Sequence, residues 1–395
     1  MADGRFTVMS GRFLFVVPPL TGHINPTVSV GAMLKKRGHD VAWVGHPGVL
    51  CSRLPADATV FPLDDKVPER LLETTTMRAN QVRGLQAFKF LWEDFLIPLA
   101  KGSFEGVLHA VSTYAPDVVI VDQQMLAGAL VCRREGLTWA MSATTSAGVT
   151  DPLAALPKIR QWMHTRLDAL QLDYGLTPVE HVDRSPVCNL VFSSRALVGD
   201  MADQLPDTVH FVGPAAQDRP QDRSFPWAVL SDEPAVFVSL GTVNQDRGAR
   251  FFQAVQDAAA GQSFQVVLVA PKALVPKPPP NVHRFDYVPQ LDLLKRMDAV
   301  VTHAGHNTVC EALSEGLPMV VVPIKDDQPI VAQQVVDAGA GVRLRFGRIT
   351  AEHLRAAIHE ILETPTYRER AQALADSFSH AGGATAAAER LEALL

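Results

Sequence analysis

The feature of this sequence that most restricts its fold is a repeated alternation of short apolar runs with helix-like segments. The run 11–17 (GRFLFVV) has the length of a strand, and the segment 25–40 after it reads as a helix. Asn25 suits the cap of that helix and Pro26 its first position. Further strand-like runs follow at 41–45 (VAWVG) and 117–122 (DVVIVD). This order predicts a parallel sheet covered by helices.

The alternation begins again in the second half of the chain. Four short apolar runs separated by helical stretches lie there, at 235–240, 265–270, 298–302 and 319–323. Between the halves, 213–226 is rich in Pro, Asp, Arg and Gln and has no apolar period, which is typical of a linker. The length of 395 residues suits two domains. We predict two Rossmann-like domains of doubly wound parallel sheet, at 1–214 and 215–375, with a C-terminal helix at 376–395 packing back on the first.

Charge and cysteine content exclude several classes of function. The net charge is −6 and no long basic run is present, so nucleic acid is a poor candidate partner. The four cysteines lie far apart without a CxxC pair, which favours reduced thiols over disulfides or a zinc site. The apolar stretch 13–20 contains two prolines and is too short to span a membrane. We expect a cytoplasmic protein without an integral membrane segment.

Polar residues follow the expected strands in both halves. They are His23, Asp122, Thr242, His303 and Asn307. Ligands of open parallel sheets bind outside the carboxyl ends of the strands. Because these residues come from both halves, the sequence predicts a site in a cleft between two domains.

The segment THAGHNTVCE (302–311) joins an expected strand to an expected helix that starts near Asn307 or Thr308. Free backbone N–H groups and the positive end of a helix dipole favour a phosphate at such a junction, and Gly305 permits close approach. The alternative is local capping, because Thr308 and Glu311 match a capping box. A metal is less favoured, since His303 and His306 have no Cys or carboxylate at a familiar ligand spacing.

His23 follows the first strand in PPLTGHINP (18–26), and Asp122 ends another strand. A histidine there acts as a general base if a carboxylate orients it. The alternatives are a helix-entry histidine bonded to the backbone and an aspartate that caps a helix. Neither GxGxxG nor GxSxG is present, which argues against a dinucleotide-binding turn and a serine nucleophile.

Two further segments suit a polar ligand. Asp326, Asp327 and Gln328 follow the last apolar run and suit the hydroxyl groups of a polyhydroxylated ligand, or else only cap a helix. Tyr287 and Gln290, in DYVPQ (286–290), suit a flat base; the alternative is a turn imposed by proline.

The order YVPQ, HAGHNTVCE and DDQ resembles the C-terminal signature of the UDP-glycosyltransferase superfamily, the inverting two-domain group. TGHINP resembles the family segment that carries the catalytic histidine, and FVGP (211–214) and VFVSLGT (236–242) resemble its linker entry and first C-domain strand. The resemblance runs from about residue 12 to 345 and implies the GT-B fold. Within the superfamily, bacterial enzymes that glycosylate natural products, such as macrolide glycosyltransferases, are most similar.

The resemblance also implies roles for matching residues. His23 would be the base and Asp122 its orienter. The donor site would comprise Thr242 near the phosphate or sugar, Tyr287, Val288 and Gln290 around the base, His303, Asn307 and Thr308 at the diphosphate, Glu311 on the ribose, and Asp327 and Gln328 on the sugar. Gly305 and His306 belong to the same turn, where Gly305 permits close approach of the anion and His306 lines the loop. Two residues depart from the usual pattern: Tyr287 replaces Trp, and Asn307 occupies a position that is often Gly in bacterial members.

The expected partners are a UDP- or dTDP-sugar and a small, largely apolar acceptor bound by residues of 70–100 and 142–175; we expect a monomer or homodimer. The resemblance implies no cofactor and no metal. Two rival functions remain. One is a nucleotide-dependent epimerase or oxidoreductase, disfavoured by the missing GxGxxG. The other is a non-catalytic GT-B partner that activates another transferase, disfavoured because His23, Asp122 and the DQ pair are present.

Overall fold

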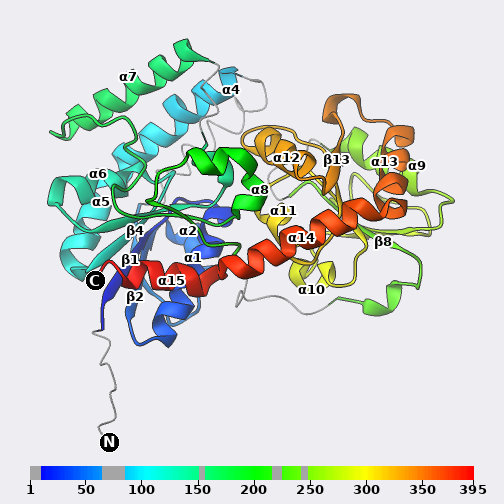
Figure 1. Ribbon diagram of the computed structural model, residues 1–395, viewed down its shortest axis with the longest axis horizontal. Helices are drawn as coiled ribbons and strands as arrows, with labels where there is room; N and C mark the ends of the chain where they lie inside the picture. Colours follow the sequence, from blue (N-terminus) through cyan, green and yellow to red (C-terminus); the bar gives the residue numbers. More distant parts are fainter. Residues whose placement is uncertain (1–9, 65–84, 151–155, 216–224, 242–247) are drawn as a thin grey trace, which may run out of the picture.

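Two parallel sheets divide the molecule (Figure 1). The computed structural model describes residues 10–64, 85–150, 156–215, 225–241 and 248–395. The first sheet has seven parallel strands in the order β3-β2-β1-β4-β5-β6-β7. Its strands are β1 (Arg12–Val16), β2 (Asp40–Gly45), β3 (Thr59–Pro62), β4 (Val118–Asp122), β5 (Trp139–Ala143), β6 (Asn189–Val191) and β7 (Val209–Phe211).

The second sheet has six parallel strands in the order β10-β9-β8-β11-β12-β13. They are β8 (Ala235–Ser239), β9 (Gln265–Val269), β10 (Val282–Phe285), β11 (Ala299–Thr302), β12 (Met319–Val321) and β13 (Gly341–Arg343). The strand order reverses between β1 and β4 in one sheet and between β8 and β11 in the other. These two switch points are where a doubly wound sheet opens a crevice for ligands.

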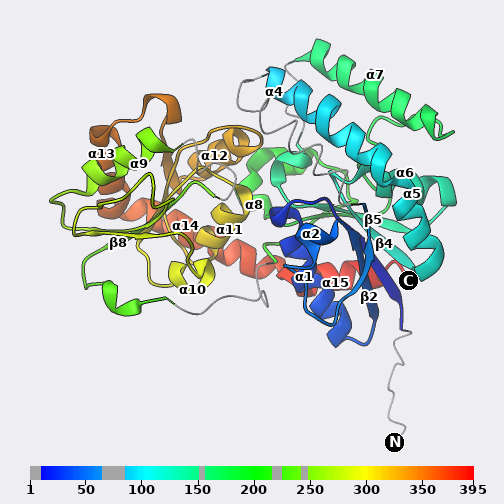
Figure 2. The same ribbon diagram turned by 180° about the vertical axis from the view of Figure 1, so that it is seen from behind.

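Helices cover both faces of each sheet (Figures 1 and 2). In the first half they are α1 (Thr21–Lys36), α2 (Pro47–Leu50), α4 (Leu85–Phe90), the π-helical η1 (Leu91–Leu96), α5 (Ile97–Tyr114), α6 (Leu126–Glu135), η2 (Ser146–Gly148), α7 (Pro157–Asp173), α8 (Arg195–Val198) and η3 (Gly199–Gln204). In the second half they are η4 (Trp227–Val229), α9 (Ala249–Ala259), α10 (Gln290–Leu294), α11 (His306–Ser314), α12 (Gln328–Asp337), η6 (Phe346–Arg348), α13 (Ala351–Glu363), α14 (Pro365–Ala381) and α15 (Gly383–Glu392). The predicted α/β class with two doubly wound sheets is confirmed.

Successive side chains of β1 enter different cores, as the two-residue period of a strand requires. Leu14 and Val16 lie in the core under α5 and α6, while Phe13 and Phe15 lie in the core shared with α1 and α15. Burial on both faces explains why the strands read as continuous apolar runs.

The first helix does not begin where the sequence predicted. Its first residue is Thr21 rather than Pro26, so Pro26 lies inside the helix and His23 in its first turn. No side chain caps α1; Leu20 is its N-cap residue. The expected Asn25 cap was wrong because an internal proline is tolerated this close to a helix start, where few i→i+4 bonds are lost.

The end of the chain crosses from one sheet to the other (Figure 1). Instead of one helix over 376–395, α14 and α15 meet at Gly382, whose φ of 87° breaks the helix. α14 packs on α11, and α15 packs on α1. Arg37 donates to Glu392 at 2.7 Å and to Glu389 at 3.1 Å. The C-terminal helices therefore contact both halves of the molecule.

Candidate active site

The first switch point joins His23 to Asp122. β1 and β4 are parallel neighbours, so the turn after β1 and the last residue of β4 meet at one edge of the sheet. Nδ1 of His23 lies 3.0 and 2.9 Å from the two carboxylate oxygens of Asp122. The structure therefore brings together two residues that are 99 positions apart in the sequence.

The Asp122 carboxylate is almost fully buried and held by further donors. The backbone N–H of Gln124 donates to it at 2.9 Å, and the hydroxyl of Thr144 donates at 3.1 Å. Asp122 does not cap α6, whose N-cap residue is Met125 with no side-chain cap. The helix-capping alternative for Asp122 was therefore wrong.

Two opposing effects set the pKa of His23. Burial lowers it, whereas the charge of Asp122 and the hydrogen bond to Asp122 raise it, and the charge of Asp327 adds to that rise. The net shift is upward. When Nδ1 donates its proton to Asp122, Nε2 is the nitrogen left to accept a proton from a ligand. Among the described residues, this side chain forms hydrogen bonds with Asp122 and Thr144, not with backbone.

The second switch point carries His303, which follows β11. Its ring packs between two glycines: a Cβ on Gly241 would lie 2.7 Å from Cε1, and one on Gly305 would lie 2.5 Å from Nε2. Gly241 also has a φ of 70°, which favours glycine. Ala304, between His303 and Gly305, has a φ of 66°, so the turn is strained.

Among the described residues, His303 has no carboxylate partner comparable to Asp122. Burial lowers its pKa to about 4, and the charge of Asp327 and a hydrogen bond to the backbone of Ser239 only partly oppose that shift. The ring is therefore neutral near pH 7. A neutral imidazole offers one N–H donor to a ligand without adding a buried charge.

α11 starts at His306 with Gly305 as its N-cap and no side-chain cap. The predicted start at Asn307 or Thr308 was therefore wrong. The capping-box alternative was also wrong, because Thr308 lies inside the first turn. Glu311 instead accepts a hydrogen bond of 2.6 Å from Nε2 of Gln290, and that nitrogen lies 3.5 Å from the Thr308 hydroxyl.

His306 and Asn307, the first two residues of α11, contact the first half of the molecule. Nε2 of His306 lies 3.1 Å from the carbonyl oxygen of Phe192, just beyond β6. Nδ2 of Asn307 donates to the carbonyl oxygen of Gly22 at 2.9 Å. Burial lowers the pKa of His306, so this ring too is neutral. Neither contact was predicted from the sequence.

The remaining expected donor residues differ in their surroundings. Oε1 of Gln328 is buried and accepts from the backbone N–H groups of Ile324 and Lys325 at 2.9 and 3.1 Å, which leaves its Nε2 for a ligand. Asp327 is the N-cap residue of α12 but forms no side-chain cap. Tyr287 is 63% exposed and Val288 is buried. Thr242 lies outside the described residues.

The residues that the sequence analysis missed share one property: they support a site residue rather than face the ligand. Thr144 holds Asp122, Gly241 packs on His303, and Gly22 and Phe192 supply carbonyls to α11. Gly241 stands in the SLGT stretch after an expected strand, so its position was a usable signal. Thr144 follows β5, a strand that the apolar runs did not indicate.

Within the part of the chain that the structure describes, no group of three or more His, Cys, Asp or Glu side chains could hold a metal ion. No helix within the same residues is long and apolar enough to cross a membrane.

Comparison with known proteins reveals related sequences and folds. Residues 258–394 match the family described as erythromycin biosynthesis protein CIII-like, C-terminal domain. The uncharacterized UDP-glucosyltransferase YdhE of Bacillus subtilis (strain 168) is 27% identical over 95% of this chain and 96% of its own. The 4'-demethylrebeccamycin synthase of Lentzea aerocolonigenes is 27% identical over 98% and 100%. The glycotransferase of kitacinnamycin has a similar structure, with a TM-score of 0.80, 24% identity and coverage of 98% and 100%.

Proposed function

We propose that this chain, a glycosyltransferase with the GT-B fold, is a member of the UDP-glycosyltransferase superfamily and transfers a sugar from a UDP- or dTDP-sugar to a hydroxyl group of a small, largely apolar acceptor, with inversion at the anomeric carbon. Its relatives place it among the enzymes that glycosylate natural products. The identities of the donor and the acceptor and the roles of the catalytic residues are what we propose.

The observation that carries the proposal is the hydrogen-bonded pair of His23 and Asp122. An alcohol does not ionise near pH 7, so its oxygen needs a base as it attacks. In the proposed step, Nε2 of His23 takes the hydroxyl proton while the oxygen forms a bond to the anomeric carbon and the bond to the diphosphate breaks. Asp122, at 2.9 Å from Nδ1, orients the ring and stabilises the imidazolium that results. A single in-line displacement of this kind inverts the anomeric carbon.

We propose that the leaving diphosphate is held at the second switch point. The uncapped N-terminus of α11 offers backbone N–H groups and the positive end of a nine-residue helix. Neutral His303 and the Thr308 hydroxyl add side-chain donors beside it. These groups are fixed before the reaction, so they stabilise the charge that develops on the leaving group without rearranging. The proposal assigns this work to the chain itself, with no metal or cofactor.

The nucleoside and sugar would bind on either side of this turn. We propose that Tyr287 and Val288 contact the base and that Glu311 and Gln290, already joined at 2.6 Å, bind the ribose hydroxyls. Asp327 and Nε2 of Gln328 would contact the sugar. The electrostatic effect of Asp327 on both His23 and His303 supports this position, because it requires the carboxylate to lie near both sides of the cleft.

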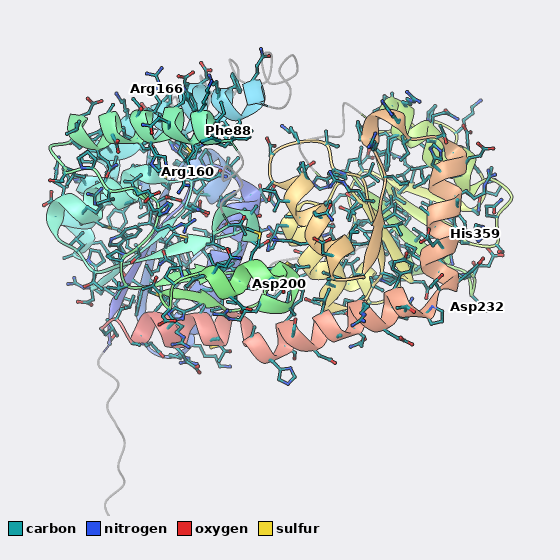
Figure 3. The ribbon with its side chains drawn as sticks, turned by 45° about the horizontal axis from the view of Figure 1, so that its top comes forward. Phe88, Arg160, Arg166, Asp200, Asp232 and His359 are labelled. Atoms are coloured by element: carbon teal, nitrogen blue, oxygen red, sulfur yellow. The ribbon has the colours of Figure 1, made fainter. Side chains whose placement is uncertain are left out.

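An aromatic cluster in the first half suits an apolar acceptor. Phe88 of α4 lies 6.3 Å from Trp92 and 6.5 Å from Trp162, measured between ring centroids, and thereby joins α4 and η1 to α7. Figure 3 shows Phe88 where these helices meet. We propose that an acceptor with rings or a hydrophobic macrocycle packs in this part of the first domain. Residues 70–84 and 151–155 of the two expected acceptor segments lie outside the described part.

The test is the His23→Ala variant. Transfer to a hydrophobic alcohol should fall by about 10²–10⁴-fold, the usual contribution of a general base, while UDP affinity measured by calorimetry stays within about twofold. A thermal-shift screen of UDP, dTDP and their glucose forms first selects the donor. Near-native turnover of His23→Ala on an unactivated alcohol would contradict the role of His23. Unchanged UDP affinity in His303→Ala would contradict the diphosphate site.

A further inference from the structure

The second turn of α1 contains a proline whose position has a specific consequence. Pro26 lies four residues after Gly22, where a regular helix would place the N–H that bonds to the Gly22 carbonyl oxygen. Proline has no N–H, so α1 cannot form that bond. The Gly22 carbonyl, one residue before His23, is therefore open to a donor from outside the helix.

Asn307 supplies that donor from the other half of the molecule. Its Nδ2 donates to the Gly22 oxygen at 2.9 Å, across 285 positions of sequence. The absence of a side chain on Gly22 permits this approach, because a Cβ there would lie 3.3 Å from Nδ2. Asn307 is the second residue of α11, directly in the turn proposed to hold the diphosphate.

We infer that Asn307 is a positioning residue that links the donor-binding turn of α11 to the turn that carries His23. This inference rests on the proposed function of the cleft. The hydrogen bond, which we name the Asn307 latch, fixes the distance between the base and the donor site. Proximity of this kind matters to rate, since a misplacement of about 1 Å can cost about 10²-fold.

The latch explains one pairing of residue types in the sequence. Pro26 removes one backbone hydrogen bond from α1. The Gly22 carbonyl that this leaves without a partner inside the helix lies one residue from the base. An amide at 307 then fits this acceptor, whereas a glycine at the same position has no side chain to reach it. Asn307 therefore acts through Gly22 on His23, and its principal partner is the protein rather than the donor diphosphate.

A double-mutant cycle tests the latch. Asn307→Ala removes the donor, and Pro26→Ala restores an N–H that competes for the Gly22 oxygen from inside α1. We expect each variant to lower kcat by about 10-fold or more, while KM for the nucleotide sugar and UDP affinity by calorimetry change by no more than about twofold. Because both act on one hydrogen bond, the double variant should be no slower than the slower single variant.

Ser377→Ala is the matched control. Its hydroxyl lies 2.8 Å from that of Ser194, so the variant also loses a hydrogen bond between the two halves, but away from the His23 turn. Its kcat should stay near wild type. An equal loss in Ser377→Ala would mean that the effect is a general loosening of the two halves, and would overturn the latch.

Two other results would also overturn it. Additive losses in the double variant would show that Asn307 and Pro26 act separately. A fall of UDP affinity by about 10-fold in Asn307→Ala with kcat unchanged would make Asn307 a donor contact. Either result, obtained while His23→Ala remains inactive, leaves the proposed function standing. If Asn307→Ala does not fold, Pro26→Ala compared with Ser377→Ala still decides the question.

Discussion

Each of the two switch points carries a histidine, and the two histidines have opposite properties. His23 follows β1 at one switch point, and His303 follows β11 at the other. The pKa of His23 is raised above its ordinary value, while that of His303 is lowered to about 4. Topology therefore selects the place of a functional residue but not its protonation.

The difference arises from the nearest partner of each ring. Burial lowers the pKa of both histidines, and the charge of Asp327 raises both, so neither effect separates them. Of the two rings, that of His23 contacts Asp122, whereas that of His303 packs between two glycines. A carboxylate makes a histidine a base whose cation is stabilised, whereas tight packing without one keeps the ring neutral.

Asp122→Asn should remove the difference and have the largest effect. Without the negative charge the imidazolium is less stable, so the pKa of His23 falls. The acid limb of the kcat/KM profile should then move to lower pH, and the rate should drop by up to about 10⁴-fold, as for the orienting aspartate of a Ser-His-Asp triad. Steady-state kinetics from pH 5 to 9 measure both. An acid limb that stays in place would show that Asp122 does not set the pKa.

Gly305→Ala should disturb the other side. The added Cβ would lie 2.5 Å from Nε2 of His303, so the ring must move from its place beside the α11 N-terminus. Loss of a hydrogen bond to a charged phosphate should weaken UDP affinity by about 10–100-fold in calorimetry. Gly347→Ala is the control, because nothing lies within 4 Å of a Cβ there. Equal UDP affinity in the two variants would show that His303 does not need a glycine at position 305 to bind the diphosphate.

The sequence predicted the two sheets and the pairing of His23 with Asp122, but it did not predict where the helices start. Apolar runs of strand length and the helices between them predicted two parallel sheets, and strand-end positions then predicted that His23 and Asp122 meet. Periodicity does not fix where a helix starts: α1 begins five residues before the expected Pro26, and α11 begins one residue before Asn307.

Contacts between the two halves were harder still. The bond from Asn307 to Gly22 depends on how two separately folded sheets pack, and no local pattern encodes that packing. The same holds for His306 and the Phe192 carbonyl. The assignment of polar residues in THAGHNTVCE to the ligand was incomplete because two of them also contact protein.

The opposite pKa shifts of His23 and His303 should also affect how the free energy of unfolding depends on pH. His303 stays neutral in the folded state down to about pH 4, whereas in the unfolded chain it gains a proton near pH 6.5. The unfolded state therefore binds more protons between these values, and stability falls as the pH falls from 6.5 to 4. His23, with a raised pKa, acts in the opposite sense: its contribution is present below pH 6.5 and lost as the pH rises through its folded value.

His303→Gln isolates this effect. Between pH 7 and pH 5, wild type should lose about 2 kcal/mol of unfolding free energy that the variant does not lose, measured by urea unfolding at both values. His306, whose pKa burial also lowers, keeps part of the pH dependence in both proteins. Identical pH dependence in wild type and variant would mean that His303 is protonated in the folded state.

Thr144→Val should have the smallest effect and the opposite sign to Asp122→Asn. The Thr144 hydroxyl donates to Asp122 at 3.1 Å and so shares the carboxylate with His23. Without that donor the carboxylate is less stabilised and interacts more strongly with the imidazolium, which raises the pKa of His23 further. The acid limb of kcat/KM should therefore move to higher pH, by less than about one unit because one neutral donor is removed.

Thr144→Ser keeps the hydroxyl and should leave the acid limb in place, which separates the hydrogen bond from the packing of the Thr144 methyl group. A shift to lower pH in Thr144→Val would mean that the hydroxyl acts mainly on the ring, whose Nδ1 lies 3.3 Å away, rather than on Asp122. Opposite shifts in Asp122→Asn and Thr144→Val would establish that the charge available to Nδ1 makes His23 differ from His303.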